Sequence, residues 1–231
     1  MSEKGVAAVD RALSILTAIG DARRALTLSE IAAATGLYKS TVLRLLASLE
    51  RARCIARDRS RRYLLGSTVY RLAATLGHSA VIATEIVSAL QRLVDETGES
   101  AGYFVREGGE RLCLLRVDSP HPLRHHIPVG VLRPLSGASG RVLELFENGA
   151  AKMSRREFAA LPIVVLGEDL PDLAAIAMPI FDGGGAILGA ISVSGPLSRF
   201  NRPLITKVKR LLREAAVTLT DRLGGDSALF G

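Results

Sequence analysis

The chain has 231 residues, enough for one large domain or two of ordinary size. Hydrophobic residues make up 48% of it and charged residues 23%, as in typical globular proteins, and the lack of tryptophan predicts an aliphatic core. No stretch approaches the roughly 20 apolar residues of a membrane helix, and no signal-peptide core follows the start. We therefore expect a cytoplasmic protein without a membrane span.

The two cysteines, Cys54 and Cys113, lie far apart and form no CxxC pair. This spacing argues against a disulfide framework and against a thiolate metal site. It fits the reducing environment of the cytoplasm.

Positive charge is concentrated in the first third of the chain. Residues 1–66 hold 12 Lys and Arg against 6 Asp and Glu, whereas residues 67–231 hold 18 against 17. Such asymmetry is expected when one domain contacts a polyanion and the other does not. Solubility alone is the alternative explanation of a basic surface.

The start of the chain carries the pattern of two helices. Apolar residues recur at helical spacing over 6–19 and predict the first helix. The segment Thr27-Leu28-Ser29-Glu30 is typical of a capping box, in which the Thr27 hydroxyl accepts from the backbone near Glu30. The second helix should therefore run over 28–35 and end at Gly36, a residue that tolerates a left-handed helix exit.

A third helix and a hairpin should follow. The helix begins near Lys39 and buries an apolar stripe formed by Val42, Leu45, Leu46 and Leu49. Residues 55–57 and 62–65 flank a polar turn and predict a hairpin that closes at Gly66. Two helices around a glycine-containing turn, followed by a basic hairpin, are the pattern of a winged helix-turn-helix domain.

The start of the third helix carries side chains suited to DNA. In a helix-turn-helix this end enters the major groove first, where such side chains contact base edges or phosphates. We expect these contacts from Lys39, Ser40, Thr41 and Arg44. The hairpin adds Arg57, Arg59, Arg61 and Arg62, which suit phosphates or the minor groove. A solvated charged turn is the alternative for these four arginines, but the adjacent helix-turn-helix favours DNA contact.

Beyond residue 66, strands alternate with a few helices. Helices are predicted over 68–76, 79–96, 139–146, 154–160 and 205–223. Strands are predicted over 101–106, 111–117, 174–181 and 186–194, with a weaker one over 123–129. Strands bracketed by helices imply an α+β fold with an antiparallel sheet. We divide the chain into a winged helix-turn-helix domain (1–66), a linker helix (67–80) and a second domain (81–231).

The sequence offers little support for an enzyme or a metal site. His121, His125 and His126 cluster near Asp118, but adjacent histidines on a strand would point to opposite faces and could not easily share one ion. Ser139 lacks the final glycine of a nucleophile elbow. The run 182–185 lacks the Lys-Ser/Thr of a phosphate loop. We therefore expect no metal, no cofactor and no catalytic residue.

Spaced segments in the right order resemble the IclR family of bacterial transcriptional regulators. They are VDRALSIL (9–16), LTLSEIA (26–32), GLYKSTVLRLL (36–46), RYLLG (62–66), SPHPLR (119–124) and ISVSGP (191–196). Together they span almost the whole chain. The resemblance implies a DNA-binding regulator, more often a repressor, that forms homodimers and in some cases tetramers. Each domain of the dimer would occupy one half of a pseudo-palindromic double-stranded DNA operator.

The resemblance also implies a GAF-like effector domain with a curved antiparallel sheet at the C-terminus. Its site is expected where a small-residue turn enters a helix and exposes backbone N–H groups that suit a carboxylate. The expected effector-binding residues are Ser136, Gly137, Ala138, Ser139, Gly140, Ala175, Ser192 and Ser194. A plain turn at 136–140, and structural hydrogen bonding by the two later serines, are the alternatives. We expect a carboxylate-bearing metabolite.

The chain departs from the family pattern at three places. Tyr38 stands where Pro or Ser is frequent, and it is expected to contact DNA and alter the target sequence. Ala175 stands where a cysteine is frequent, which removes a thiol contact from the pocket. The segment 147–173 is shorter than the family pattern. An enzyme with a fused basic module and an architectural DNA binder without a ligand remain the rival hypotheses.

Overall fold

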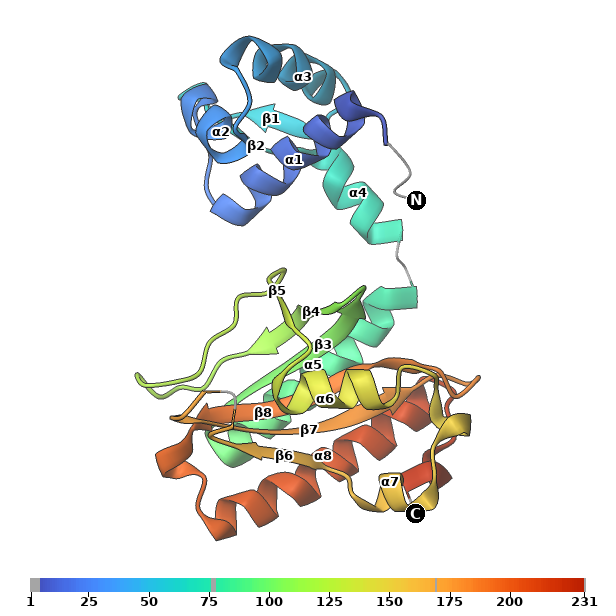
Figure 1. The fold of residues 1–231 in the computed structure, drawn as a ribbon. Coiled ribbons are helices and arrows are strands. Elements are labelled where there is room, and N and C mark those ends of the chain that lie inside the picture. The colour runs from blue at the N-terminus through green and yellow to red at the C-terminus, as the bar shows by residue number, and fades with distance from the viewer. Residues whose placement is uncertain (1–4, 76–77, 169, 231) are drawn as a thin grey trace. The chain divides into compact units, whose positions relative to one another are not determined.

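The computed structural model describes residues 5–75, 78–168 and 170–230 (Figure 1). The chain divides into two compact units, Met1–Ala80 and Val81–Gly231. Each unit has its own hydrophobic core. None of the helices in the described ranges is long and apolar enough to cross a bilayer.

The first unit is a winged helix-turn-helix. Its elements are α1 (Ala7–Ala22), α2 (Leu28–Thr35), α3 (Lys39–Arg51), β1 (Ile55–Arg57), β2 (Tyr63–Leu65) and α4 (Ser67–Thr75). The predicted helices and hairpin are all present, with their ends shifted by at most three residues. Leu26 adds a bridge that was not predicted, since it exchanges two backbone hydrogen bonds with Tyr63 of β2 (2.8 and 2.7 Å).

The core of this unit is aliphatic, as the composition suggests. Ile15, Ile31, Val42 and Leu46 are fully buried, and burial of each such side chain contributes about 1.5–3 kcal/mol. Leu45 of the predicted stripe is only half-buried. The apolar side chains at the start of α1 lie outside this core, because Val6, Val9 and Leu13 are 67%, 53% and 55% exposed.

The predicted capping box and helix exit are both present. Thr27 Oγ1 accepts from the backbone of Glu30 at 3.3 Å, and the Glu30 carboxylate accepts from the backbone of Thr27 at 2.7 Å. Backbone and side-chain hydrogen bonds from Thr27 and Arg24 lower the pKa of Glu30 to about 2. Gly36 ends α2 with a φ of +67°.

The helices predicted over 68–76 and 79–96 are both present, as α4 and α5. α4 ends at Thr75 and α5 (His78–Thr97) begins three residues later. Residues 76 and 77 of the predicted linker lie outside the described residues.

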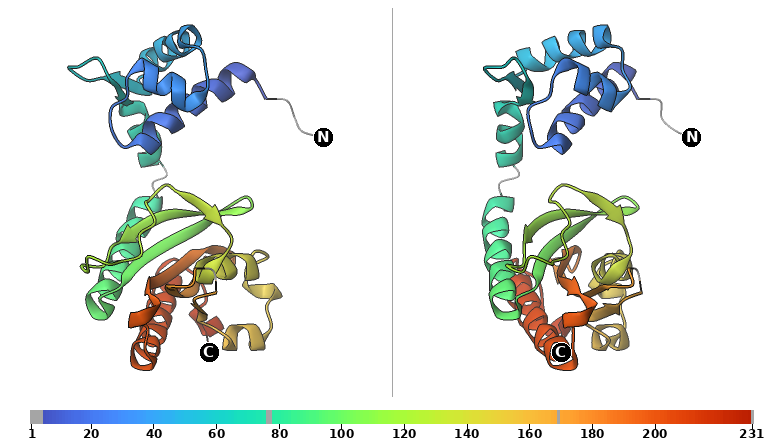
Figure 2. Two further views of the ribbon diagram at one scale, coloured as in Figure 1. Left: turned by 60° about the vertical axis from the view of Figure 1, so that its left-hand side comes forward. Right: turned by 90° about the vertical axis from the view of Figure 1, so that its left-hand side faces the viewer.

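The second unit is built on a six-stranded antiparallel sheet. Its strands are β3 (Ser100–Glu107), β4 (Glu110–Val117), β5 (Leu132–Pro134), β6 (Ile163–Leu166), β7 (Leu173–Phe181) and β8 (Ile187–Pro196). Their order in the sheet is β5-β4-β3-β8-β7-β6, with β3 and β8 at the centre. Figure 2 shows that the sheet is curved, which confirms the expected fold class.

Helices cover both faces of this sheet. α5 and α8 (Arg202–Arg222) pack on one face, and α6 (Gly137–Leu145) packs on the other (Figure 2). The short α7 (Arg155–Ala159) lies at one end, beside an aromatic cluster of Phe146, Phe158, Phe181 and Phe230. Short 3-10 turns occur over Ala150–Lys152, Leu197–Arg199 and Ser227–Phe230.

The weak strand predicted over 123–129 is wrong. This segment is irregular, and the edge strand is instead β5, which starts at Leu132. Two backbone carbonyls of the segment accept from arginine side chains rather than from a strand: Leu123 O from Arg199 (3.0 Å), and His125 O from Arg116. Pro128 has no N–H to donate to a ladder.

The segment between α6 and β7 completes the sheet with the strand β6. β6 was not predicted, because four apolar residues between Pro162 and Gly167 give no distinctive period. It pairs with β7 from Ile163↔Ala177 to Leu166↔Ala174. The segment therefore supplies the edge of the sheet opposite β5.

The capping box yields a prediction about stability. Thr27→Ala removes the hydroxyl that accepts from the start of α2, and it should lower the free energy of unfolding of the first unit by about 1 kcal/mol. Urea denaturation followed by circular dichroism measures the change. Ser29→Ala, at an exposed position of the same turn, is the matched control. Equal stability of the two variants would contradict the capping role.

Candidate functional site

The first half of α3 presents a polar, exposed surface. Lys39, Ser40 and Arg44 are exposed, and Tyr38, which precedes the helix, is 85% exposed. Thr41 is half-buried. Because Val42 and Leu46 anchor the opposite face in the core, the helix cannot rotate and the predicted residues remain on the surface.

The tip of the wing is an ordered turn. The Asp58 carboxylate accepts from the backbone N–H groups of Ser60 (2.8 Å) and Arg62 (2.9 Å). Arg61 has a φ of +59°, an uncommon conformation for a residue with a side chain. The turn leaves Arg59, Arg61 and Arg62 exposed.

Arg57 differs from the other wing arginines. Its guanidinium pairs with Glu50 of α3 at 3.0 Å and lies over the Tyr63 ring at 4.9 Å. It therefore joins the wing to α3, and only part of its charge is presented to solvent.

The second unit contains a cavity of about 400 Å³ on the α6 face of its sheet. The start of α6 forms one wall, and side chains from all six strands and from the loop after β4 form the others. The lining residues are Phe104, Arg111, His125, His126, Ile127, Arg133, Pro134, Ser136, Gly137, Ala138, Ser139, Val165, Leu170, Leu173, Ala175, Ser192 and Ser194.

Seven of the eight residues expected to bind an effector line this cavity. Ser192 and Ser194 project from β8, and Ala175 lies opposite Ser194 on β7. Gly140 is the exception, because it faces the chain before α6. A Cβ atom there would lie 2.5 Å from the carbonyl carbon of Leu135, so this glycine permits close packing of α6 rather than ligand contact.

The start of α6 forms part of the cavity wall. Ser136 is the N-cap, but its side chain makes no capping hydrogen bond. Gly137 has a φ of +67°, which favours glycine. The first amides of a helix lack intrahelical partners and carry partial positive charge, so this end suits an anion.

The cationic side chains of the cavity were not predicted from the sequence. Arg111 was placed on a strand without a role, Arg133 was not considered, and His125 was discussed only as a metal ligand. The sequence pattern gave no sign that Arg111 and Arg133 face one cavity. Arg133 lies on β5, a strand that was not predicted, and only the pairing of β5 with β4 brings it next to Arg111.

His125 is held against the cavity wall in its neutral form. Its Nδ1 lies 2.9 Å from Ser194 Oγ. Burial, together with the guanidinium groups of Arg116, Arg111 and Arg133, lowers the pKa of His125 to about 4. Neutral imidazole has one donor and one acceptor, so His125 can hydrogen-bond a ligand with the nitrogen that faces away from Ser194.

Asp118 organises the loop that carries these histidines. Its carboxylate pairs with Arg116 at 2.6 Å and with His126 Nδ1 at 2.8 Å. Partial burial alone would raise the pKa of Asp118, but these hydrogen bonds outweigh it and the pKa is lowered. No group of three metal-ligating side chains occurs within the residues that the structure describes.

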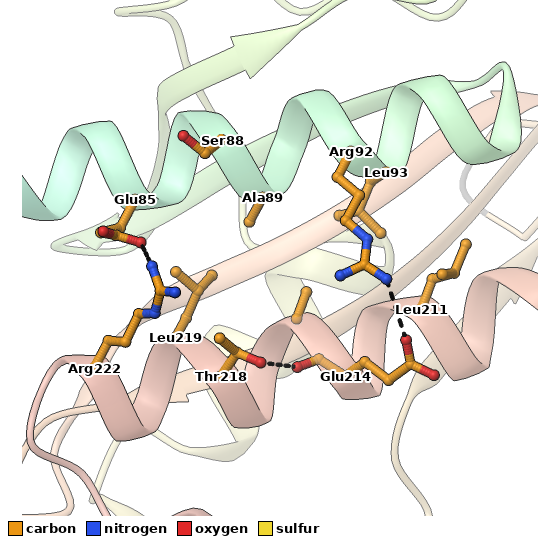
Figure 3. Close-up of a pocket in the computed structure, with 11 residues that line it drawn as sticks. Glu85, Ser88, Ala89, Arg92, Leu93, Leu211, Glu214, Thr218, Leu219 and Arg222 are labelled. Carbon is orange, nitrogen blue, oxygen red and sulfur yellow. Dashed lines mark hydrogen bonds and ion pairs between the residues drawn. The ribbon is translucent and has the colours of Figure 1, made fainter.

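A second hollow, of about 190 Å³, lies between α5 and α8 and is here named the α5–α8 groove (Figure 3). Leu93, Leu211 and Leu219 form its apolar floor. Its charges are balanced, because Arg222 pairs with Glu85 and Arg92 lies 3.8 Å from Glu214. The groove therefore offers no unbalanced charge to a ligand.

The low pKa of His125 generates a prediction. The folded-state pKa of about 4 lies below the ordinary 6.5, so between these values the unfolded chain binds a proton that the folded chain does not. This contribution to the free energy of unfolding is present above pH 6.5 and is lost as pH falls toward 4. NMR titration of the His125 ring should give a midpoint near pH 4. A midpoint near 6.5 would contradict the buried, cation-flanked environment.

Comparisons with known proteins agree with this geometry. Residues 8–59 match the family model of the IclR helix-turn-helix domain, and residues 163–220 match that of the bacterial transcriptional regulator IclR C-terminal domain. SauR of Cupriavidus necator, which carries the name of a transcriptional regulator, is 31% identical over 228 residues, covering 86% of this chain and 90% of SauR. The transcriptional repressor AllR of Escherichia coli K12 is 24% identical over 251 residues, covering 97% and 93%.

Solved structures show the same fold. An IclR homologue from Microbacterium hydrocarbonoxydans, crystallised with 4-hydroxybenzoate, superposes with a TM-score of 0.77 at 22% identity, covering 94% of this chain and 99% of that one. The relatives are named as regulators and not as enzymes. The chain belongs to the IclR family of transcriptional regulators.

Proposed function

We propose that this protein is a repressor that binds a specific DNA operator through residues 1–66 and releases it in response to a small carboxylate bound by residues 81–231. The exposed start of α3 beside a basic wing supports the DNA contact. Tyr38, Lys39, Ser40, Thr41 and Arg44 would contact base edges and phosphates in the major groove. Arg59, Arg61 and Arg62 would contact phosphates or the minor groove, with Arg57 supporting them.

The operator would be bound by a homodimer. The exposed Val6, Val9 and Leu13 form an apolar face at the start of α1. Tyr70 and Leu72 of α4 are also 79% and 60% exposed. Contiguous exposed apolar side chains mark association surfaces. A symmetric dimer would place two copies of α3 on the two halves of a pseudo-palindrome.

The effector would occupy the cavity at the start of α6. The observation that carries this assignment is that the uncapped start of α6, Arg111 and three buried serines (Ser139, Ser192 and Ser194) line one cavity. A carboxylate fits this set, because it accepts from amides, hydroxyls and guanidinium groups together. The homologue crystallised with 4-hydroxybenzoate also holds a carboxylate, which is consistent with this choice.

Effector binding would act on DNA affinity through the connecting helices α4 and α5. The two DNA-binding domains of the dimer would exchange between an arrangement that fits the operator and one that does not. An effector shifts this exchange only as far as it binds one arrangement better than the other. A coupling free energy of about 1–3 kcal/mol is typical and would change operator affinity about 5- to 150-fold. Tetramers formed from two dimers are compatible with this mechanism.

Substitutions in α3 test the DNA contact. Arg44→Ala should cost about 1–3 kcal/mol of specific affinity, and Lys39→Ala should weaken binding to all sequences and reduce its salt dependence. Binding to DNA from the upstream intergenic region is measured against scrambled DNA over a salt series, with two chains expected per site. Arg51→Ala, at the far end of α3, is the matched control. Retained specific affinity in Arg44→Ala, with the fold intact, would refute the assignment of this helix.

Ser194→Ala tests the effector cavity. Loss of the hydroxyl removes the hydrogen bond that positions His125, so the response of DNA affinity to a carboxylate effector should weaken by about 0.5–1.5 kcal/mol. DNA affinity without effector should not change. The measurement is the effector concentration that half-releases the operator. An unchanged value would remove Ser194 from the binding site.

A further inference from the structure

The end of α5 and the loop after β4 meet around a buried carboxylate. Glu99 lies between α5 and β3, and its side chain is only 2% exposed. The Arg199 guanidinium pairs with both carboxylate oxygens, since Nη2 donates to Oε2 at 2.7 Å and Nε donates to Oε1. A buried carboxylate costs free energy unless it is paired, and this two-point contact is the strong form of such a pair. Glu99 therefore holds the Arg199 side chain in one orientation.

Gly195 of β8 makes room for this ion pair. A Cβ atom at this position would overlap Glu99 Oε2, so a larger residue would displace the carboxylate. Gly195 directly follows Ser194, which lines the cavity. Successive residues of a strand face opposite sides of the sheet. The pair between Glu99 and Arg199 therefore lies behind the β8 wall of the cavity, on the other face of the sheet.

Arg199 also holds the segment that follows β4, here named the 118–126 loop. Its Nη1 donates to the carbonyl of Leu123 at 3.0 Å. The planar guanidinium carries several donors in a fixed geometry, so it can bind the carboxylate and this carbonyl at once. The side chain that neutralises Glu99 therefore also fixes the backbone of the loop.

Ser119 joins the same loop to the end of α5. Its hydroxyl donates to the carbonyl of Gly98 at 2.5 Å, and its backbone N–H donates to Ser100 Oγ at 3.0 Å. The loop is thus attached to residues 98–100, where α5 passes into β3. The segments 119–124 and 191–196, which carry the resemblance to the family, meet at this junction.

The 118–126 loop also carries His125 into the cavity wall. Its Nδ1 lies 2.9 Å from Ser194 Oγ, and Arg116 donates to its backbone carbonyl. His125 follows Leu123, the residue held by Arg199, by two positions. The backbone contact on one face of the sheet and the imidazole on the other are therefore parts of one short segment.

We propose that Arg199 is a positioning residue of the effector cavity. Paired with Glu99, it holds the 118–126 loop so that His125 closes the cavity wall, and it ties the position of that loop to the end of α5. A ligand that shifts His125 therefore acts on α5, the helix at the start of the second unit. The positioning of His125 requires no ligand, whereas its effect on regulation rests on the proposed effector function.

Arg199→Lys tests the positioning in the full chain without ligand. Lysine keeps a charge beside Glu99 but lacks the planar fork that also reaches the Leu123 carbonyl. Burial is the largest cause of the low pKa of His125, so a loosened loop should move its NMR titration midpoint upward from about 4. We expect a shift of about half a unit or more. Backbone hydrogen exchange over 118–126 should become about fivefold faster or more.

Two further variants make this test decisive. Arg210→Lys makes the same change in an exposed ion pair with Glu214 on α8 and should alter neither reading. If Arg199→Lys does not fold, Glu99→Gln/Arg199→Gln removes both charges, leaves neither unpaired and should show the same two changes. An unchanged His125 midpoint would overturn the positioning role even if the loop exchanged faster, because the ion pair would then be only structural.

Benzoate, a singly charged carboxylate, tests the link to α5. Bound to the unaltered protein, it should slow hydrogen exchange in the 118–126 loop and at the end of α5, over 93–99. In Arg199→Lys the slowing over 93–99 should be lost, and its persistence would overturn the link. If calorimetric titration detects no benzoate binding to the unaltered protein, the proposed carboxylate function fails and the link to α5 fails with it. The positioning of His125 is then decided by the ligand-free measurements.

Discussion

The second unit depends on the close approach of α6 to the strand that precedes it. Gly140 allows this contact, because any Cβ atom there would overlap the backbone of Leu135. The approach buries the first residues of α6 and brings Ser139 to the Arg111 guanidinium on β4. It also places the start of the helix, which has no side-chain cap, at the cavity wall. A larger residue at position 140 would therefore disturb the cavity wall without touching a ligand.

The two units use positive charge differently. In the first unit, arginines sit on an exposed turn, where they are well hydrated and cost little until a polyanion arrives. In the second unit, Arg111 and Arg133 are opposed on neighbouring strands and both line a cavity, where Arg111 is held by Pro134 and Ser139. The excess of positive charge in residues 1–66 indicates only the basic surface of the first unit.

Local sequence signals predicted local structure well. The capping box at Thr27, the glycine exit at Gly36 and the alternation of Ser192 with Ser194 are short-range features, and the structure contains each of them. The same reasoning failed over 123–129, where arginine side chains from distant segments take the backbone carbonyls that a strand would have used. It also missed β6, whose four apolar residues have no distinctive period and form a strand by pairing with β7.

The sequence by itself determined the winged helix-turn-helix, the α+β class of the second unit and the family, because capping, periodicity and spaced motifs are encoded over short distances. It also located most of the residues around the cavity, through the small-residue turn before α6 and the serines of β8. Only the tertiary structure decided which cations join them. Arg111 and Arg133 are 22 positions apart in sequence, His125 reaches Ser194 across 69, and strand pairing and loop packing alone bring them together. The charge of the cavity is therefore a property of sheet register, which no local pattern of residues specifies.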